Sequence, residues 1–365
     1  MNHDLRAVGS QFQVFGTLIH FETWGSGHIN DTYAATYNQG GALIRYVHQR
    51  INHHVFKNPP LVMDNIRRVT GHMTQKLIAL DHDDLTRRAL TLVPTRDGAA
   101  YFHDANGDYW RTYVLIERGR TYDVIETPRV AFEGAKAYGQ FQKLLIDLPA
   151  PRLHETIPDF HHTPTRFAAL QRAIETDPCQ RAHSAATEIA FALHREPMTR
   201  VLVDLQQAGE LPERTTHNDT KMNNVIYDQK TLESICVTDL DTVMPGLVLY
   251  DFGDMVRTAS CPAAEDERDL SKMQMRMDLF EALVRGYLAS ASDFLTKPER
   301  NYLAFSGKLI TFEIGIRFLT DYLEGDHYFK THRDGHNLDR CRAQFALVES
   351  IERQEDAMNK FVERV

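Results

Sequence analysis

The chain has 365 residues, of which 42% are hydrophobic and 25% are charged. At roughly 150 residues per domain, this length predicts about two lobes, with enough apolar residues for a core that needs no disulfide or structural metal. Lys and Arg total 41 against 50 Asp and Glu, and the resulting net charge of -9 is unfavourable for binding nucleic acid or an anionic membrane. We therefore expect neither partner.

The cysteine pattern and the lack of long apolar runs indicate the compartment. The four cysteines are far apart and form no CxxC pair, which is typical of proteins in a reducing environment. No stretch of about 18 apolar residues is present to cross a bilayer, and the segment after Met1 lacks the apolar core of a signal peptide. We expect a soluble cytoplasmic protein.

The first hundred residues are expected to be mostly strands. Gly40-Gly41 and Asn106-Gly107 are typical of hairpin turns, and the flanking segments are rich in branched and aromatic residues. One helix is expected after Pro59-Pro60, because apolar residues then recur at helical spacing. The expected strands cover residues 14–21, 32–37, 42–51, 99–102 and 109–116.

Beyond residue 117 helical periodicity dominates, interrupted by a hairpin over residues 225–238. The expected helices cover residues 130–148, 165–175, 182–193, 198–209, 268–291, 298–324 and 338–362. The pattern predicts an α+β fold with two lobes. We expect a small sheet-rich N-terminal lobe over 1–116, a larger helical lobe over 117–365, and a hinge over 117–122.

The most informative segment is His217-Asn-Asp219-Thr-Lys221-Met-Asn-Asn224. It matches H-x-D-x-x-x-x-N, the spacing of the catalytic loop in phosphoryl-transfer kinases. In that chemistry Asp219 meets the attacking hydroxyl, and Asn224 turns back toward the metal on the phosphates. Lys221 is the expected cation for the transferring phosphate.

The segment after this loop predicts a metal site. Residues 225–227 and 234–238 are strand-like and flank a turn, so an antiparallel hairpin brings Asn224 and Asp239 to one open end. Their oxygens suit Mg²⁺, which takes one or two protein carboxylates together with phosphates and water. Asp241 is a candidate second ligand.

Two further motifs are less specific. Asp251-Phe-Gly253 matches a kinase metal-binding triplet, but it follows Pro245-Gly246 and lies away from the hairpin end, so we expect Asp251 to brace the catalytic loop instead. Gly25-Ser-Gly27-His28-Ile-Asn30 lies between two strands, where glycines allow backbone amides to approach phosphates. Gly25, Gly27 and Asn30 are therefore candidate nucleotide contacts.

On these motifs the sequence resembles the aminoglycoside phosphotransferase and choline kinase superfamily, and most closely the N-acetylhexosamine 1-kinases. The similarity extends along nearly the whole chain. Its most specific segments are residues 25–33, 216–226, 238–246, 250–254 and 317–326.

The resemblance implies a bilobal kinase that transfers phosphate from ATP to the anomeric hydroxyl of GlcNAc or GalNAc. It implies Asp219 as the base, and Asn224 and Asp239 on Mg²⁺. It also implies sugar contacts from Arg317 and Tyr328, with His28 a further candidate.

The residues themselves leave the role of Arg317 open. Arg317 lies in an apolar helix and needs either a ligand oxygen or a carboxylate partner. Asp321 and Glu313 lie at helical spacing from it and would serve as that partner. A salt bridge and a ligand contact are equally compatible with the pattern.

One departure from the kinase pattern concerns the phosphate clamp. Protein kinases carry a Lys on the third strand of the small lobe, and the apolar pattern here places Gln49 at that position. We expect Arg50, Arg67 or only the backbone and Mg²⁺ to replace it. The paired histidines, 53–54 and 161–162, are expected at the surface or at helix caps.

Two alternatives stay open. One is a kinase that acts on another hydroxyl, of the aminoglycoside, choline or methylthioribose type. The other is a silent nucleotide-binding regulator, suggested by the missing Lys and opposed by the presence of Asp219, Asn224 and Asp239 together.

Overall fold

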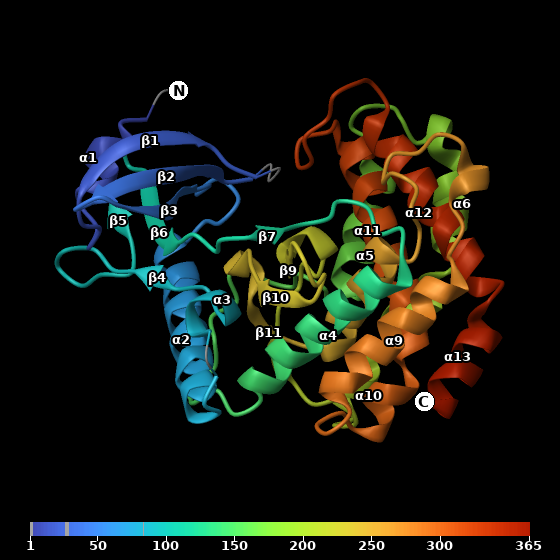
Figure 1. Ribbon diagram of the computed structural model, residues 1–365. Helices are drawn as coiled ribbons and strands as arrows, with labels where there is room; N and C mark the ends of the chain where they lie inside the picture. Colours follow the sequence, from blue (N-terminus) through green and yellow to red (C-terminus); the bar gives the residue numbers. More distant parts are fainter. Residues whose placement is uncertain (1–2, 26–28, 83) are drawn as a thin grey trace.

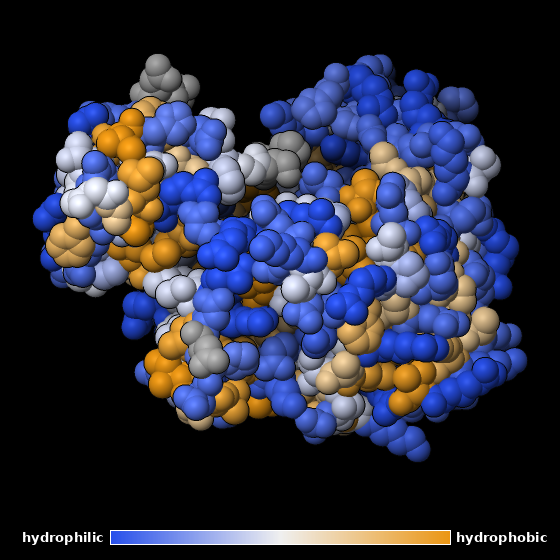
Figure 2. Space-filling model, in the orientation of Figure 1, coloured by the Kyte–Doolittle hydropathy of each residue, from blue (hydrophilic) through white to orange (hydrophobic). Residues whose placement is uncertain are grey.

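The computed structural model describes residues 3–25, 29–82 and 84–365. It has the expected α+β fold, with a sheet-rich part formed by the N-terminal residues beside a larger helical part (Figure 1). An indentation separates the two parts at the top of the space-filling view, and hydrophilic side chains border it on the helical side (Figure 2). Gly27 and His28 lie outside the described residues.

The N-terminal sheet is antiparallel throughout. Its strand order is β1-β2-β3-β6-β4, with β5 paired to β6. The strands are β1 (Thr17–Thr23), β2 (Asp31–Gln39), β3 (Ala42–Ile51), β4 (Leu92–Val93), β5 (Phe102–His103) and β6 (Tyr109–Val114). The helices of this part are α1 (Leu5–Gly9), α2 (Pro59–Ala79) and α3 (Leu85–Arg88).

The two faces of this sheet have different neighbours. On β3, Val47 and Ile51 pack in the core that includes α2, whereas Tyr46 packs in a separate apolar cluster on the other face. Because side chains alternate along a strand, Gln49 lies on the same face as α2, and Arg50 lies on the opposite face. This alternation decides which of the two can reach the helical part.

The helical part packs around a buried core. Its helices are α4 (Pro128–Leu145), α5 (Thr163–Thr176), α6 (Ala186–His194), α7 (Val201–Gln207), α8 (Val248–Ala259), α9 (Met277–Ala291), α10 (Lys297–Asn301), α11 (Leu303–Glu324), α12 (His336–Glu352) and α13 (Glu355–Arg364). A Cβ on Gly253 of α8 would collide with the Ser306 carbonyl of α11, so this glycine permits their close packing. Across the described residues, every helix is too short or too polar to cross a membrane.

The expected helix over 268–291 begins only at Met277. Before it, Met273 and Met275 are buried in an irregular segment. The Met275 amide donates to Ser350 Oγ (2.9 Å), and the Arg276 amide donates to the Ser260 carbonyl (2.8 Å). These distant partners hold the backbone outside a helix, which helical periodicity alone does not reveal.

The two other long helices that we expected are each divided in two. Tyr302 separates α10 from α11 and has φ -96° and ψ 9°, outside the helical region. Residues 353–354 separate α12 from α13, and the side chain of Gln354 donates to the Met275 carbonyl (2.9 Å). In both cases apolar spacing continues across the break.

In the described residues after the N-terminal sheet, five short strands form one three-stranded and one two-stranded sheet. They are β7 (Gly119–Arg120), β8 (Arg214–Thr216), β9 (Val225–Asp228), β10 (Ser234–Val237) and β11 (Met244–Gly246). The expected hinge contains β7, which pairs with β9 of the hairpin. A Cβ on Gly119 would collide with the side chain of Ile226, so the close approach of these strands requires glycine. We propose that the N-terminal lobe ends at residue 116, just before β7.

Buried His48 predicts a pH dependence of stability. Its ring contacts the Tyr37 hydroxyl (2.9 Å) and Thr112 Oγ1 (2.8 Å), and burial lowers its pKa from 6.5 to about 4. Below pH 6.5 the unfolded chain therefore binds the proton more readily, so stability falls as pH falls toward 4. This histidine should contribute about 2 kcal/mol of the loss between about pH 7 and about pH 5.

Urea unfolding of the wild type and of His48→Gln at both pH values measures this contribution. The substitution should remove about 2 kcal/mol from the pH-dependent change, because glutamine does not titrate. An unchanged pH dependence would show that His48 is not held neutral in the folded state.

Candidate active site

Asp251 of α8 binds the backbone of the catalytic loop that the sequence predicts. One carboxylate oxygen of Asp251 accepts from the His217 amide (2.9 Å) and the other from the Asn218 amide (2.7 Å). The Gln142 side chain donates to the same carboxylate (2.6 Å). Asp251 is fully buried. The structure thus confirms that Asp251 braces the loop by hydrogen bonds.

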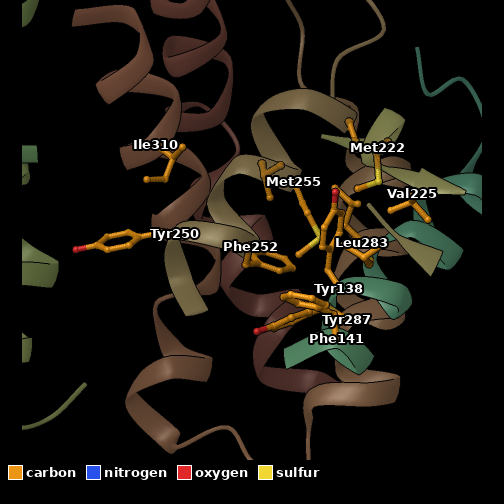
Figure 3. Close-up of a cluster of buried hydrophobic side chains, with 14 of the residues drawn as sticks. Tyr138, Phe141, Met222, Val225, Tyr250, Phe252, Met255, Leu283, Tyr287 and Ile310 are labelled. Atoms are coloured by element: carbon orange, nitrogen blue, oxygen red, sulfur yellow. The ribbon is translucent and has the colours of Figure 1, made fainter. Parts of the chain in front are cut away.

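The hydrophobic core also fixes this loop. Met222 and Val225, at its end, are buried in the same cluster as Phe252 and Met255 of α8 (Figure 3). The ring of His217 is buried, with Nε2 donating to the Thr238 carbonyl (2.9 Å) and Nδ1 accepting from the Asp219 amide (3.3 Å). Both ring nitrogens thus hold the backbone around the catalytic loop in place.

Asp219, Lys221 and Asn224 meet at the open side of the loop. Lys221 Nζ lies 3.2 Å from Asp219 Oδ1, and Asn224 Nδ2 donates to Asp219 Oδ2 (3.2 Å) and to its carbonyl (2.9 Å). Burial opposes ionisation of Asp219, but the surrounding positive groups, Lys221 foremost, together outweigh burial and lower the pKa of the carboxyl group. Asp219 is therefore ionised at neutral pH, as a proton acceptor must be.

The hairpin brings Asn224 and Asp239 to one end, as the sequence predicts. Val225 pairs with Val237, and the Thr238 amide donates to the Asn224 carbonyl (2.8 Å). Asp239 follows directly and has a positive φ of 55°, which turns the chain away from the strand. The side-chain nitrogen of Asn224 donates to Asp219, so the side-chain oxygen of Asn224 stays available as a metal ligand.

The carboxylates at this end repel one another. The protein surrounding Asp239 and the negative charges of Asp241 and Asp219 raise the pKa of Asp239 to about 6. A divalent cation would relieve this repulsion, and an amide oxygen with one or two carboxylates suits Mg²⁺. Within 3–25, 29–82 and 84–365, no three His, Cys, Asp or Glu side chains form a metal-holding group. Phosphate and water would therefore complete the coordination.

Arg111 of β6 is a site residue that the sequence analysis missed. It lies opposite Gln49 in the sheet, and its Nε and one terminal nitrogen donate to Gln49 Oε1 (2.8 and 2.6 Å). Its other terminal nitrogen forms a buried ion pair with Asp241. A cation therefore lies beside the carboxylates at the hairpin end, on the strand next to the expected one. An arginine within the apolar segment Tyr109–Val114 was the available signal.

Of the candidate nucleotide contacts, Asn30 lies at the hairpin end and Arg50 does not. Asn30 Nδ2 donates to Asp241 Oδ2 (2.6 Å), which links the glycine-rich turn to the hairpin end. Gly25 has φ 82°, a conformation that favours glycine. Arg50 instead lies on the far face of the sheet, where Asp31 (2.5 Å) and Asp108 (2.9 Å) bind its guanidinium. This placement argues against Arg50 as a phosphate ligand.

Two further residues occupy positions that differ from expectation. Arg67 is mostly exposed and pairs with Asp64 of the same helix (2.8 Å), so it too lies apart from the hairpin end. The carboxylate of Asp241 is divided between Asn30 and Arg111. In this arrangement Asp241 orients two groups from the N-terminal part, and Asp239 is the carboxylate that faces the open side.

The candidate acceptor contacts lie on the helical side. Arg317 of α11 stacks over the rings of Phe160, Tyr328 and Phe329, with 5.0 Å to the Phe160 centroid. It also donates weakly to the Tyr328 hydroxyl (3.4 Å). The side chain of Tyr328 is exposed. The structure thus brings together two of the three residues that the resemblance implies, and His28 lies outside the described residues.

His161 connects this region to the catalytic loop. Its Nδ1 lies 2.7 Å from Glu313 of α11, and its Nε2 lies 3.1 Å from the Asn218 carbonyl. Both His161 and Glu313 are buried. The expected surface or capping role is wrong for His161, but His162 does cap α5 by accepting from the Thr165 amide (3.2 Å). Adjacent histidines point in different directions, so they have different roles.

Comparison with known proteins agrees with this site. A family model described as the phosphotransferase enzyme family matches residues 20–291, which is most of the chain. The chain belongs to the phosphotransferase enzyme family. The catalytic loop, the hairpin and Asp251 all lie within the matched residues.

Solved structures with a similar fold span nearly the whole phosphotransferase. An aminoglycoside phosphotransferase from Alicyclobacillus acidocaldarius has a TM-score of 0.61 and 12% identity, over 98% of this chain and 96% of that one. The microcompartment-associated aminopropanol kinase has a TM-score of 0.58 and 15% identity, over 97% and 98%. For an ethanolamine kinase from Plasmodium vivax the values are 0.53 and 14%, over 89% and 82%. At these identities the likeness shows a shared fold.

The brace by Asp251 predicts a stability effect in this phosphotransferase. In Asp251→Asn a side-chain NH₂ replaces one of the oxygens that accept buried N–H groups, which should lower the free energy of unfolding by about 1–3 kcal/mol. Asp293→Asn is the matched control, because this carboxylate is exposed and forms a surface ion pair with Lys143. Chemical denaturation should show a change of less than about 0.5 kcal/mol there. Equal effects in both variants would contradict the brace.

Proposed function

We propose that the protein is an ATP-dependent sugar kinase that phosphorylates the 1-hydroxyl of N-acetylhexosamines, GlcNAc or GalNAc. The observation that carries the proposal is the meeting of Asp219, Lys221 and Asn224 beside Asp239, with Arg317 and Tyr328 on the helical side. Membership of the phosphotransferase enzyme family supports the phosphoryl transfer. The sugar specificity rests on the sequence resemblance.

In the proposed reaction Asp219 orients the sugar 1-hydroxyl and accepts its proton. An anomeric hydroxyl is more acidic than an ordinary alcohol, because the ring oxygen withdraws electron density. Positioning and charge neutralisation therefore supply most of the acceleration. Lys221, 3.2 Å from Asp219, stands where it can bind the transferring phosphate once the substrate separates the two groups.

The metal would be held by the Asn224 side-chain oxygen and by Asp239. Bound there, Mg²⁺ would neutralise charge on the nucleotide phosphates. Asp241 keeps its place in the proposal as support, because its carboxylate orients Arg111 and Asn30. Asp239, with its pKa raised to about 6, binds the metal most readily when it is deprotonated.

We assign the phosphate clamp of the N-terminal part to Arg111. The backbone of the turn that begins at Gly25 and the side chain of Asn30 would hold the same phosphates from the other side. Gln49, at the position of the kinase lysine, orients the Arg111 guanidinium through two hydrogen bonds (2.8 and 2.6 Å). An arginine on the neighbouring strand β6 thus replaces the lysine that protein kinases carry on the third strand.

A second candidate function is a kinase for another small alcohol, of the aminoglycoside, choline or methylthioribose type. It is favoured by the shared fold with proteins named as aminopropanol, ethanolamine and aminoglycoside kinases. Those names describe other proteins at 15% identity or less. The two candidates differ in the charge of the acceptor.

A panel of sugars and amino alcohols with ATP and Mg²⁺ tests the function, with ADP release as the assay and phosphorus NMR to locate the phosphate. We expect GlcNAc or GalNAc 1-phosphate. In Asp219→Asn, kcat should fall by about 10²–10⁴, while the KM for the sugar changes little. Phosphate on another hydroxyl, or activity on choline or kanamycin alone, would favour the second candidate. Near-normal turnover by Asp219→Asn would show that Asp219 is not the base.

The phosphate clamp predicts a nucleotide-specific defect. In Arg111→Gln the KM for ATP should rise about 10- to 100-fold, because a charge-assisted hydrogen bond is lost. Arg50→Gln is the matched control on the neighbouring strand, and its KM for ATP should change less than about twofold. Arg111→Lys restores the charge and should recover part of the affinity. A larger effect at Arg50 than at Arg111 would contradict the assignment.

A further inference from the structure

Two arginines lie together on the helical side of the catalytic loop. Arg317 of α11 stacks over the Phe160 ring at 5.0 Å from its centroid. Arg166 of α5 donates two hydrogen bonds to the carbonyl of the same residue, from Nε and from one terminal nitrogen (both 3.1 Å). Both guanidinium groups therefore contact the same residue, Phe160, one at its ring and the other at its carbonyl oxygen.

Neither arginine has a carboxylate partner among the described residues. Glu313 and Asp321 lie four residues before and after Arg317, at the spacing that normally gives helical ion pairs. Glu313 instead binds His161 (2.7 Å) and accepts from Thr163 Oγ1 (2.6 Å). The Asp321 carboxylate accepts from the amides of residues 327, 328 and 329 and from Asn337 Nδ2. Both potential partners of Arg317 are therefore occupied.

Placing two positive charges together without an ion-pair partner for either is unfavourable. Burial, and next the charge of Arg317, lower the pKa of Arg166, so the two groups repel each other; the charges of Glu313 and Asp159 oppose this only in part. Aromatic stacking compensates only in part, because cation–π contacts are weaker than an ion pair in a desolvated site. An oxygen-bearing ligand would supply the missing partner.

The arginine pair is joined directly to the catalytic loop. His161 follows Phe160, and its Nε2 lies 3.1 Å from the Asn218 carbonyl. Asn218 precedes Asp219, the proposed base. The side chain of Tyr328 is exposed beside Arg317. The pair therefore lies where the part of an acceptor remote from its reacting hydroxyl would be bound.

We propose that Arg166 and Arg317 together select the acceptor by charge: they bind a carbonyl or carboxylate oxygen and exclude molecules that carry an ammonium group. The inference rests on the proposed function in placing the reacting hydroxyl at Asp219. Guanidinium groups donate readily to such oxygens, whereas a like charge in the same place costs binding energy. For an amino sugar, the N-acyl form is accepted and the free amine is rejected.

The same property separates this chain from the second candidate function. Aminopropanol and ethanolamine, named for two structures with the same fold, are cationic alcohols at neutral pH. A site with two unpaired arginines is unsuited to them. The two arginines would therefore restrict the substrate class to alcohols without an ammonium group.

Steady-state kinetics at saturating ATP and Mg²⁺ test the proposal with three acceptors that share one skeleton: N-acetylglucosamine, glucose and glucosamine. We expect kcat/KM to decrease in that order, with about 100-fold or more between the first and the last at neutral pH. Arg166→Gln and Arg317→Gln should each reduce this ratio by about 10-fold, with the KM for ATP unchanged. Arg172→Gln, exposed on the same helix as Arg166, is the matched control and should leave the ratio unchanged.

Arg166→Lys and Arg317→Lys keep the charge and should retain the rejection of glucosamine while losing part of the preference for the acetyl group. Thermal unfolding establishes that each variant is folded. If Arg317→Gln does not fold, the Arg166 variants alone test the proposal. A wild type that prefers glucosamine, or a ratio that neither Gln variant changes, would overturn the proposal.

Failure of the proposed function gives a different result. If another alcohol is phosphorylated and no hexosamine is, the charge selection is measured on that alcohol's own pair, for example ethanolamine and N-acetylethanolamine. Preference for the acylated member supports selection by the two arginines even though the sugar assignment fails. Preference for the ammonium form overturns it.

Discussion

The structure depends on holding three carboxylates, Asp219, Asp239 and Asp241, at the open end of one hairpin. Burial, and next their mutual repulsion, raise the pKa of Asp239 to about 6. Two cations offset the repulsion, Lys221 on the catalytic loop and Arg111 from the sheet. The N-terminal and helical parts therefore meet where negative charge is most concentrated. A nucleotide with its metal would bind where the protein has left charge uncompensated.

Much of the fold follows from the sequence because its patterns are local. Gly40-Gly41 and the branched residues of β3 define a hairpin, and Pro59 begins a helix with a continuous apolar face. The breaks in the long helices could not be predicted. They depend on contacts such as that of Gln354 with Met275, which join segments far apart in the chain. Helical spacing continues through such breaks, so periodicity does not detect them.

The candidate site divides in the same way. Asp219, Asn224 and Asp239 belong to one loop and one hairpin, so their spacing was sufficient to bring them together. The sequence marks Arg111 only as an arginine within a strand, because its position beside Gln49 depends on the pairing of β3 with β6, some 60 residues apart (Gln49 with Arg111). The same limit applied to Arg50, whose role was inferred without knowing which face of the sheet it occupies.

We propose that Asn224 and Asp239 form one metal site with a bound nucleotide. A crystal structure with Mn²⁺ and a non-hydrolysable ATP analogue tests it most directly, because the anomalous signal of manganese locates the ion. We expect a peak about 2.0–2.3 Å from the side-chain oxygens of both residues. A peak that lies away from both side chains, with nucleotide bound, would contradict it.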